Sequence, residues 1–261
     1  MKNLLRKIPI LGPIGYKLAS AIRNTGRVLR GKNKARRYSF RRAELDNGED
    51  DTFDRSIKQA VNLLNYTKTS GATYNGVDFP AGYHTLQING VELPGQREPA
   101  ERLELLPFDF TNKTVLDIGC NQGGMLFAVG DRISQGIGID YDSRLINAAN
   151  KIRSLKRAAN LDFYVFNLED ENLSVIKDFL PDKKVDVVFL LSVCMWIKNW
   201  KEVINLATEV SDCLLFESNG RTEQQEEQIA YLRDRYKSVQ QLSEKSEDDK
   251  SQKNRKLFYC S

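Results

Sequence analysis

The sequence predicts a three-layer α/β fold, in which helices cover a mostly parallel sheet that ends in an antiparallel hairpin. Short apolar runs alternate with helical patterns from residue 111 onward, as in sheets built from right-handed crossovers. A glycine-rich turn directly follows the first of these runs. The last two apolar runs are separated by a polar loop instead of a helical pattern. These observations predict a parallel sheet closed by two antiparallel strands.

The expected strands are short and apolar. The first begins at Thr114 and ends in Asp117, and the second is a short run that ends in Asp140. The almost uninterrupted apolar run over 184–191 is typical of a strand buried on both faces. Other strands are expected over 161–167, 211–217, 238–242 and 256–260, and helices over 125–133, 143–159, 171–180, 200–210 and 221–236.

Residues 44–110 precede the sheet, and we expect them to form a cap over its ligand-bearing edge. Helical patterns cover 53–66 and 99–106. Between them, residues 82–90 and 91–97 have the pattern of a short hairpin followed by a loop. The chain is thus divided into a segment 1–43, a cap 44–110 and a sheet domain 111–261.

The turn after the first strand has the spacing Asp117-x-Gly119-x-Asn121-x-Gly123, and Asp140 follows Asp117 after 23 residues. Glycines let backbone N–H groups approach a ligand that a Cβ would block, and asparagine tolerates a left-handed backbone better than most residues. An acid beside the turn disfavours a pyrophosphate but suits an amino group. An acid at the end of the second strand is placed to bind a ribose hydroxyl. The alternative interpretation is an ordinary tight strand–helix turn.

This pattern resembles the first motif of class I S-adenosylmethionine-dependent methyltransferases, and Asp140 resembles their ribose-binding acid. The resemblance covers residues 111–261 and implies a Rossmann-like methyltransferase sheet with S-adenosyl-L-methionine as cofactor. The residues that it implies for cofactor binding lie after successive strands: Asp117, Gly119, Cys120, Asn121, Gly123, Asp140, Tyr141, Asn167, Leu168 and Ser192.

The acceptor is expected to present an oxygen. Methyltransferases that act on adenine or glutamine nitrogen carry Asn or Asp, two prolines and an aromatic residue after the fourth strand, whereas this chain has Leu-Ser-Val-Cys-Met-Trp over 191–196. A hydroxyl acceptor needs a base, and the candidates are His84, the only histidine, and Glu217 at the end of the fifth strand. Arg97 is a candidate for contact with the methionine carboxylate of the cofactor or with the acceptor, and Trp196 for contact with the acceptor. Packing or exposure to solvent is the alternative for each candidate.

Local resemblances point to different acceptors. The 140–146 segment, the Gly119-Cys-Asn turn and the 191–197 segment resemble RNA 5′-phosphate methyltransferases. The Gly-Tyr-His-Thr and Pro-Gly-Gln-Arg segments are similar to those of transfer-RNA wobble-uridine carboxymethyltransferases. The proline-interrupted N-terminus resembles those of bacterial enzymes that build cell-surface polysaccharides.

The positive charge of the chain is concentrated at its start. Residues 1–43 contain thirteen Lys or Arg and no acid, whereas the whole chain has a net charge of +4. Because apolar residues recur among these charges and the longest uncharged apolar run is only nine residues, we expect a basic amphipathic segment on an anionic membrane surface. Binding of nucleic-acid phosphates and a solvated tail are the alternatives.

The four cysteines, Cys120, Cys194, Cys213 and Cys260, have neither C-x-x-C spacing nor a histidine cluster. We therefore expect no metal, and reduced cysteines in a cytoplasmic protein. Together, these features predict an enzyme that methylates oxygen on a cell-surface glycan or a lipid-linked small molecule, at the inner face of the membrane. An RNA methyltransferase and an inactive cofactor-binding scaffold are the alternatives, and the oligomeric state stays open.

Overall fold

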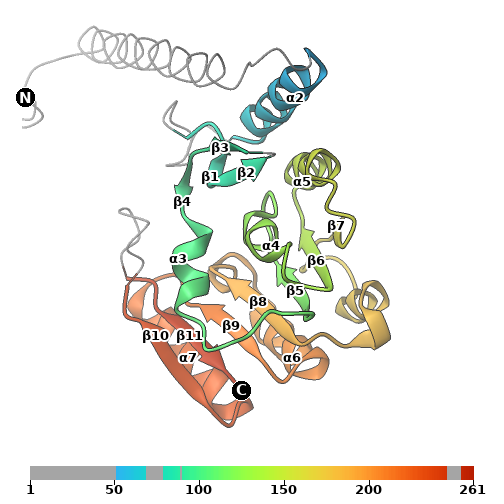
Figure 1. Cartoon of the computed structure of the whole chain (residues 1–261). Helices are drawn as coiled ribbons and strands as arrows, with labels where there is room; N and C mark the ends of the chain where they lie inside the picture. Colours follow the sequence, from blue (N-terminus) through green and yellow to red (C-terminus); the bar gives the residue numbers. More distant parts are fainter. Residues whose placement is uncertain (1–50, 69–78, 89, 246–253) are drawn as a thin grey trace, which may run out of the picture. The chain divides into compact units, whose positions relative to one another are not determined.

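The computed structural model describes residues 51–68, 79–88, 90–245 and 254–261 (Figure 1). The basic segment 1–43 lies outside these residues, so the membrane and nucleic-acid interpretations of it stay predictions. The described residues from Thr52 onward belong to one compact unit. The expected cap is therefore described as part of the unit that contains the sheet.

Seven strands of the described chain form the main sheet, in the order β10-β11-β9-β8-β5-β6-β7 (Figure 1). The strands from β9 to β7 run parallel, while β11 is antiparallel to both β9 and β10. This confirms the predicted mostly parallel sheet with a closing hairpin. The strands are β5 (Thr114–Ile118), β6 (Gln135–Asp140), β7 (Leu161–Val165), β8 (Val187–Leu191), β9 (Leu214–Glu217), β10 (Val239–Ser243) and β11 (Leu257–Cys260).

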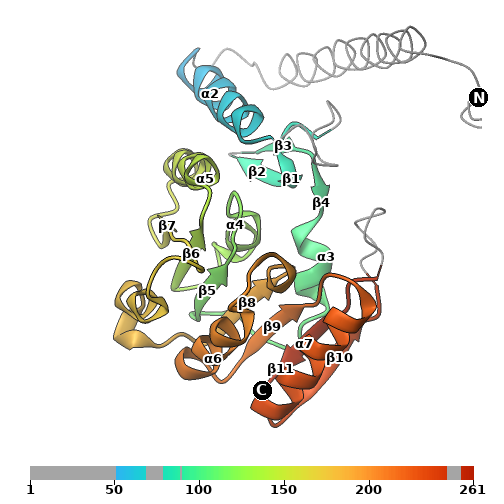
Figure 2. The same cartoon turned by 180° about the vertical axis from the view of Figure 1, so that it is seen from behind.

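Helices cover both faces of this sheet. On one face lie α4 (Gly124–Val129), whose Leu126 reaches Gly136 of β6, and α5 (Ser143–Lys156), which packs on β6 and β7. On the other face lie α6 (Trp200–Val210) and α7 (Thr222–Arg235), which stand in front of the sheet in Figure 2. Right-handed crossovers produce this division, because the strand order reverses between β6 and β8.

The core beneath α6 and α7 follows the two-residue period of the strands. Alternate residues of β5, β6, β8 and β9 point into one cluster with the buried face of these helices. The members contributed by these four strands are Leu116, Ile118, Ile137, Ile139, Val188, Leu190, Leu214 and Phe216. Burial of this many large apolar side chains makes the sheet a rigid base for the loops at its edge.

The prediction of an α-helix over 171–180 is wrong. The structure instead has two 3₁₀ segments, η3 (Leu173–Phe179) and η4 (Pro181–Lys183). Asn172 caps the first segment through its side chain, and Pro181 disfavours a helical conformation at Leu180. The stretch between cap and proline is therefore too short for a stable α-helix.

The described part of the cap region contains α2 (Asp51–Thr67), four short strands and α3 (Pro99–Glu104). β2 (Leu86–Ile88) and β3 (Val91–Leu93) form the expected hairpin, and β1 (Gly82–His84) pairs in parallel with β4 (Gly95–Arg97). Within 82–90 the chain leaves β1 and enters β2 at Thr85, so the pairing of β1 with β4 is found in addition to the expected hairpin. This break lets β1 and β4 run side by side towards the sheet, which brings His84 opposite Arg97.

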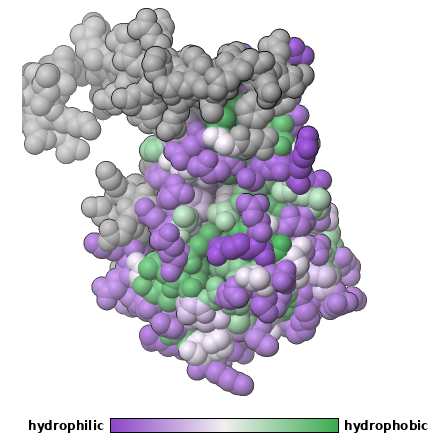
Figure 3. Space-filling model, viewed as in Figure 1, coloured by the Kyte–Doolittle hydropathy of each residue, from purple (hydrophilic) through white to green (hydrophobic). Residues whose placement is uncertain are grey.

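The described surface in Figure 3 is largely hydrophilic, with hydrophobic residues gathered near the centre of that face. Among the described residues, no helix combines the length and apolarity that a membrane span requires.

Candidate functional site

The turn after β5 has the backbone that the motif predicts. Gly119 and Gly123 have φ angles of 77° and 79°, and Asn121 has a φ of 54°. A Cβ on Gly119 would lie 2.5 Å from Cγ2 of Val193, which follows β8. Glycine is therefore required at position 119 by both backbone and space. This turn, which we call the glycine cradle, is held at the ends of β5 and β6, because its backbone N–H groups donate to Ile139 and Asp140 of β6 and to Cys120 and Asn121 within the turn.

Asp140 closes β6 beside this cradle. Its carboxylate accepts hydrogen bonds from the backbone N–H groups of Asn121 and Asp142, each at 2.9 Å. Each carboxylate oxygen has two lone pairs, so both can still accept hydrogen bonds from ligand hydroxyls. Asp140 thus holds the turn and is suited to the two hydroxyls of a ribose.

Asp117 is buried at the end of β5, and its Oδ2 has no hydrogen-bond partner among the described residues. Burial, together with the negative charge of Asp140, raises the pKa of the Asp117 carboxyl to about 8. A buried polar atom without a partner is costly unless a ligand satisfies it. The ammonium group of S-adenosylmethionine has the matching charge and donors, so Asp117, Asp140 and the glycine cradle fit this cofactor.

The other residues expected to bind the cofactor surround the same edge. Cys120 is buried in the turn, and Tyr141 is 73% exposed directly after Asp140. The side chain of Asn167 donates a hydrogen bond to Asp170, and Leu168 is buried in the core cluster. These placements leave Tyr141 as an exposed ring beside Asp140, and the cofactor contacts of all four residues stay predictions.

Ser192 follows β8 with a φ of 60°, which is uncommon for a residue with a Cβ. Two contacts hold it there. Its backbone N–H donates to the carbonyl of Glu217 at 3.0 Å, and its carbonyl accepts a hydrogen bond from the side chain of Asn219 at 2.5 Å. Strained backbone of this kind is typical of functional sites. Trp196, four residues later, is 66% exposed, whereas Trp200 packs edge-on against Tyr231.

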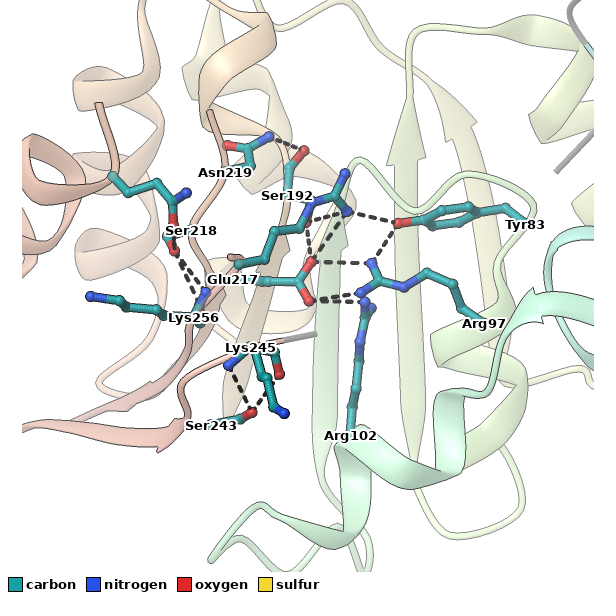
Figure 4. A network of polar contacts seen from close by, with 12 residues as sticks. Tyr83, Arg97, Arg102, Ser192, Glu217, Ser218, Asn219, Ser243, Lys245 and Lys256 are labelled. Atoms are coloured by element: carbon teal, nitrogen blue, oxygen red, sulfur yellow. Dashed lines mark hydrogen bonds and ion pairs between the residues drawn. The ribbon is translucent and has the colours of Figure 1, made fainter. Parts of the chain in front are cut away.

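Glu217 lies at the centre of a buried polar cluster beside Ser192 (Figure 4). Its carboxylate accepts two hydrogen bonds from the guanidinium of Arg97, at 3.0 and 3.2 Å, and one from Arg102 at 2.9 Å. The Ser192 hydroxyl also donates to Glu217. Both oxygens of Glu217 are therefore already acceptors for strong donors, a setting that suits the positioning of guanidinium groups better than proton transfer.

Arg255 and Tyr83 complete this cluster. Arg255 donates to the Ser192 hydroxyl at 3.0 Å and lies 3.6 Å from Glu217, and the Tyr83 hydroxyl accepts hydrogen bonds from Arg97 at 2.6 Å and Arg255 at 3.3 Å. We define the arginine cluster as Arg97, Arg102 and Arg255 around Glu217. Sequence reasoning identified Arg97 and Glu217 but missed Tyr83, Arg102 and Arg255, since no spacing in the chain links them.

His84 is 4% exposed, and its ring lies against Gly124 at the start of α4. Burial, with a further contribution from the positive charge of Arg97, lowers the pKa of His84 to about 3. Its two ring nitrogens have no hydrogen-bond partner among the described residues. His84 is thus neutral and weakly basic, and its catalytic role stays a prediction.

The four cysteines are free in the structure, and three of them, Cys120, Cys194 and Cys260, are buried. Burial raises the pKa of the Cys260 thiol to about 12. In the described part of the chain, no three or more His, Cys, Asp or Glu side chains gather in a way that could hold a metal ion.

Comparison with known proteins identifies the protein family to which this chain belongs. Residues 109–256 match the family model of the methyltransferase domain. Protein 235L of Invertebrate iridescent virus 6, whose name assigns it to the methyltransferases, is 35% identical over 91 residues, which are 34% of this chain and 29% of that protein. The U6 snRNA methylphosphate capping enzyme Amus of Drosophila melanogaster is 36% identical over 111 residues, covering 37% of this chain and 36% of that protein.

A solved structure shows the same fold. The N-terminal domain of EvdMO1, determined in the presence of SAH and D-fucose, superposes with a TM-score of 0.55 at 12% identity and covers 82% of this chain and 98% of that one. The chain spans about a third of the length of the two curated relatives.

Proposed function

Because this chain belongs to the methyltransferase domain family, we propose that it transfers a methyl group from S-adenosylmethionine to an oxygen of its acceptor. The observation that carries the cofactor assignment is the buried, unpartnered Oδ2 of Asp117 beside Asp140 and the glycine cradle. An amino group fits Asp117, and ribose hydroxyls fit Asp140.

When bound, the cofactor would supply a methyl group on a sulfonium, with S-adenosylhomocysteine as the leaving group. The residues of this chain then have to hold and align the two reactants, which can contribute roughly 7–11 kcal/mol. Asp117 and Asp140 hold the cofactor at β5 and β6. Ser192, directly after the neighbouring strand β8, lies where the acceptor would approach.

Two features support an oxygen acceptor. The segment 191–196 lacks the proline pair and the amide or acid that amino-methylating enzymes place there. The groups around Ser192 are guanidinium and hydroxyl donors, which complement an oxygen-rich acceptor better than an exocyclic amine.

For the acceptor itself, we propose a glycan or a lipid-linked small molecule. The basic amphipathic pattern of residues 1–43 supports this class, since such a segment would hold the enzyme at an anionic membrane surface where these acceptors are made.

The second candidate is an RNA acceptor. It is supported by the 36% identity to an enzyme named for methylphosphate capping of U6 snRNA, and by the local resemblance of the 140–146 and 191–197 segments to RNA 5′-phosphate methyltransferases.

Transfer of a labelled methyl group from S-adenosylmethionine into separated membrane-lipid, glycan and RNA fractions tests this function. We expect label in the lipid or glycan fraction with the full chain, none with Asp140→Ala, and normal transfer with Asp131→Asn, a change at an exposed position. Label in RNA alone would favour the second candidate. Equal labelling by the wild type and Asp140→Ala would contradict the assignment of the cofactor site.

A further inference from the structure

Trp196 is a large apolar ring exposed on the side of the sheet edge where the acceptor would bind. It ends η5 (Cys194–Trp196), shortly after the turn at Ser192 with its positive φ, and it is 66% exposed. In the sheet, β8 lies next to β5, so the loop after β8 lies beside the turn after β5. A single exposed apolar residue needs no explanation by itself. Trp196 differs because the backbone that carries it is held on both sides.

Asn219 holds the first part of this loop. Its buried side chain donates a hydrogen bond to the carbonyl of Ser192 at 2.5 Å, drawn in Figure 4, and accepts one from the backbone N–H of Met195 at 2.9 Å. Gln228 of α7 fixes Asn219 in turn. Its side chain accepts from the backbone N–H of Asn219 at 3.2 Å and donates to the carbonyl of Asn219 at 3.0 Å. One buried amide group therefore connects both ends of the 192–195 turn to α7.

Other contacts attach this loop to the turn after β5 and to the segment after β7. Cγ2 of Val193 lies 2.5 Å from the position that a Cβ on Gly119 would occupy, so Val193 packs directly on the turn. The backbone N–H of Lys198 donates to the carboxylate of Glu169 at 2.9 Å. Because its backbone is fixed on both sides, Trp196 loses little conformational freedom when a ligand contacts its ring.

The charges beside Trp196 distinguish between two kinds of ligand ring. The hydrogen bond between Lys198 and Glu169 joins residues 196–199, which contain one cation, to residues 168–171, which contain three exposed acids. Carboxylates repel the phosphates that accompany the bases of a nucleic acid. They accept hydrogen bonds from sugar hydroxyls, while the C–H face of a sugar ring packs on an aromatic ring as other apolar groups do. This combination favours a sugar.

We propose that Trp196 is the platform on which a sugar ring of the acceptor stacks, and that Asn219 is a positioning residue that holds this platform beside the turn after β5. This rests on the proposed function and narrows its acceptor to a glycan, free or linked to a lipid. Asn219 is buried, so it acts through the backbone of Ser192 and Met195. Stacking on Trp196 aligns the sugar relative to a cofactor held at the ends of β5 and β6.

Fluorescence of Trp196 tests the platform, because the chain has two tryptophans and Trp200→Phe leaves Trp196 as the only one. Acrylamide quenching is measured in the full chain with bound S-adenosylhomocysteine. The probes are methyl glycosides of hexoses, 6-deoxyhexoses and N-acetylhexosamines, and oligouridylate. We expect at least one glycoside to lower the quenching constant roughly twofold or more, and oligouridylate to leave it unchanged. Protection by oligouridylate as strong as that by any glycoside, or by none of these probes, would overturn the proposal.

Asn219→Ala, made in the Trp200→Phe protein, tests the positioning role. It removes both hydrogen bonds to the loop, so we expect faster depolarisation of Trp196 fluorescence and a glycoside affinity lower by roughly fivefold or more, with unchanged S-adenosylhomocysteine affinity. Asn160→Ala is the matched control, because the amide of Asn160 also holds a loop, 2.9 Å from the carbonyl of Gly130, but before the amino ends of β6 and β7. Equal losses in the two variants, or no loss in Asn219→Ala, would overturn the positioning role.

Variants of Trp196 separate recognition from folding, since changes to an exposed side chain usually affect stability little. In methyl transfer to the separated glycan fraction, Trp196→Ala should raise KM roughly tenfold while kcat changes by less than about twofold, as expected for a lost binding contact. Trp196→Phe keeps an aromatic ring and should restore most of the loss. Unchanged KM in folded Trp196→Ala protein would overturn the proposal. Failure of the wild type to bind S-adenosylhomocysteine would instead count against the proposed function, independently of how glycosides affect Trp196.

Discussion

The ring of His84 lies so close to Gly124 that a Cβ on this glycine would be 2.4 Å from the Cβ of His84 and 2.6 Å from its Cγ. This contact joins β1 of the cap to the first residue of α4, directly after the turn that follows β5. Gly124 does not have a positive φ, so the requirement for glycine is one of space. The cap and the turn are therefore packed as a single structure.

A double-mutant cycle measures this contact. Gly124→Ala should lower the free energy of unfolding by roughly 1–3 kcal/mol, as overpacking does in a closely packed site. His84→Ala removes Cγ and the rest of the ring but keeps the Cβ, so the double variant should regain only part of the stability that Gly124→Ala loses. Thermal or denaturant unfolding of the four proteins checks this. Strictly additive losses would show that the two residues do not meet.

The low pKa of His84 predicts how stability depends on pH. Neutral His84 is favoured in the folded state, so its contribution is fully present above its unfolded pKa of about 6.5. That contribution is lost as the pH falls from there towards the folded value of about 3. His84→Gln should therefore lose less stability than the wild type between pH 7 and pH 4. A parallel loss in both proteins would contradict a buried neutral imidazole.

The low pKa of buried His84 also predicts how the rate of methyl transfer depends on pH. If the acceptor oxygen is already ionised, no histidine base is needed. Turnover should then not rise between about pH 6 and pH 7, and His84→Gln should leave the pH–rate profile unchanged in this range. A histidine base would give such a rise, and a hundredfold or greater loss of turnover in His84→Gln with unchanged cofactor affinity would restore the expectation drawn from the sequence. Glu217→Gln serves as the corresponding test of the second base candidate.

Asp117 predicts a proton release on cofactor binding. With a pKa of about 8, its carboxyl is mostly protonated at pH 7 in the free protein. The cofactor ammonium favours the ionised form, so binding of S-adenosylhomocysteine at pH 7 should release nearly one proton. The dependence of the binding enthalpy on buffer ionisation measures this number. Asp117→Asn should release none, and a wild-type value of zero would contradict the pairing.

The mostly parallel sheet with its closing hairpin, and the turn after β5, could be predicted because both depend on local patterns. Apolar runs that end at Asp117 and Asp140 identify parallel strands, and glycine spacing identifies the turn. The 3₁₀ segment at Leu173–Phe179 could not be predicted in the same way, since its apolar residues also fit a helical period. The 3₁₀ conformation follows from the short distance between the cap at Asn172 and Pro181, which leaves too few residues for a stable α-helix.

The arginine cluster could be predicted only in part. Arg97 and Glu217 could be identified as candidates because the sequence places Arg97 in a loop before a helix and Glu217 at the end of a strand. Tyr83 and Arg255 meet although they are 172 residues apart in the sequence, and only the hairpin at the C-terminus brings Arg255 to the site. A contact that depends on the register of a distant strand has no signature in a single sequence.

Residues 1–43 lead to a separate prediction about the membrane. Deleting them should leave the affinity for S-adenosylhomocysteine unchanged and abolish co-sedimentation with vesicles of phosphatidylserine and phosphatidylcholine, since the deletion removes thirteen basic residues. Vesicles of phosphatidylcholine alone are the control. If the truncated protein still sediments with anionic vesicles, the segment is not the membrane-binding element, and a preference of the full chain for RNA at moderate salt would favour the nucleic-acid alternative.

The central claim is that Asp140 and the turn after β5 hold the cofactor, and calorimetric titration with S-adenosylhomocysteine tests it most directly. Asp140→Ala removes a charged acceptor, so its affinity should fall by roughly 1–3 kcal/mol, while Asp131→Asn at an exposed position should bind like the wild type. Circular dichroism confirms that each variant is folded. Equal affinities of the wild type and Asp140→Ala would contradict the account, because Asp140 would then not be the ribose ligand.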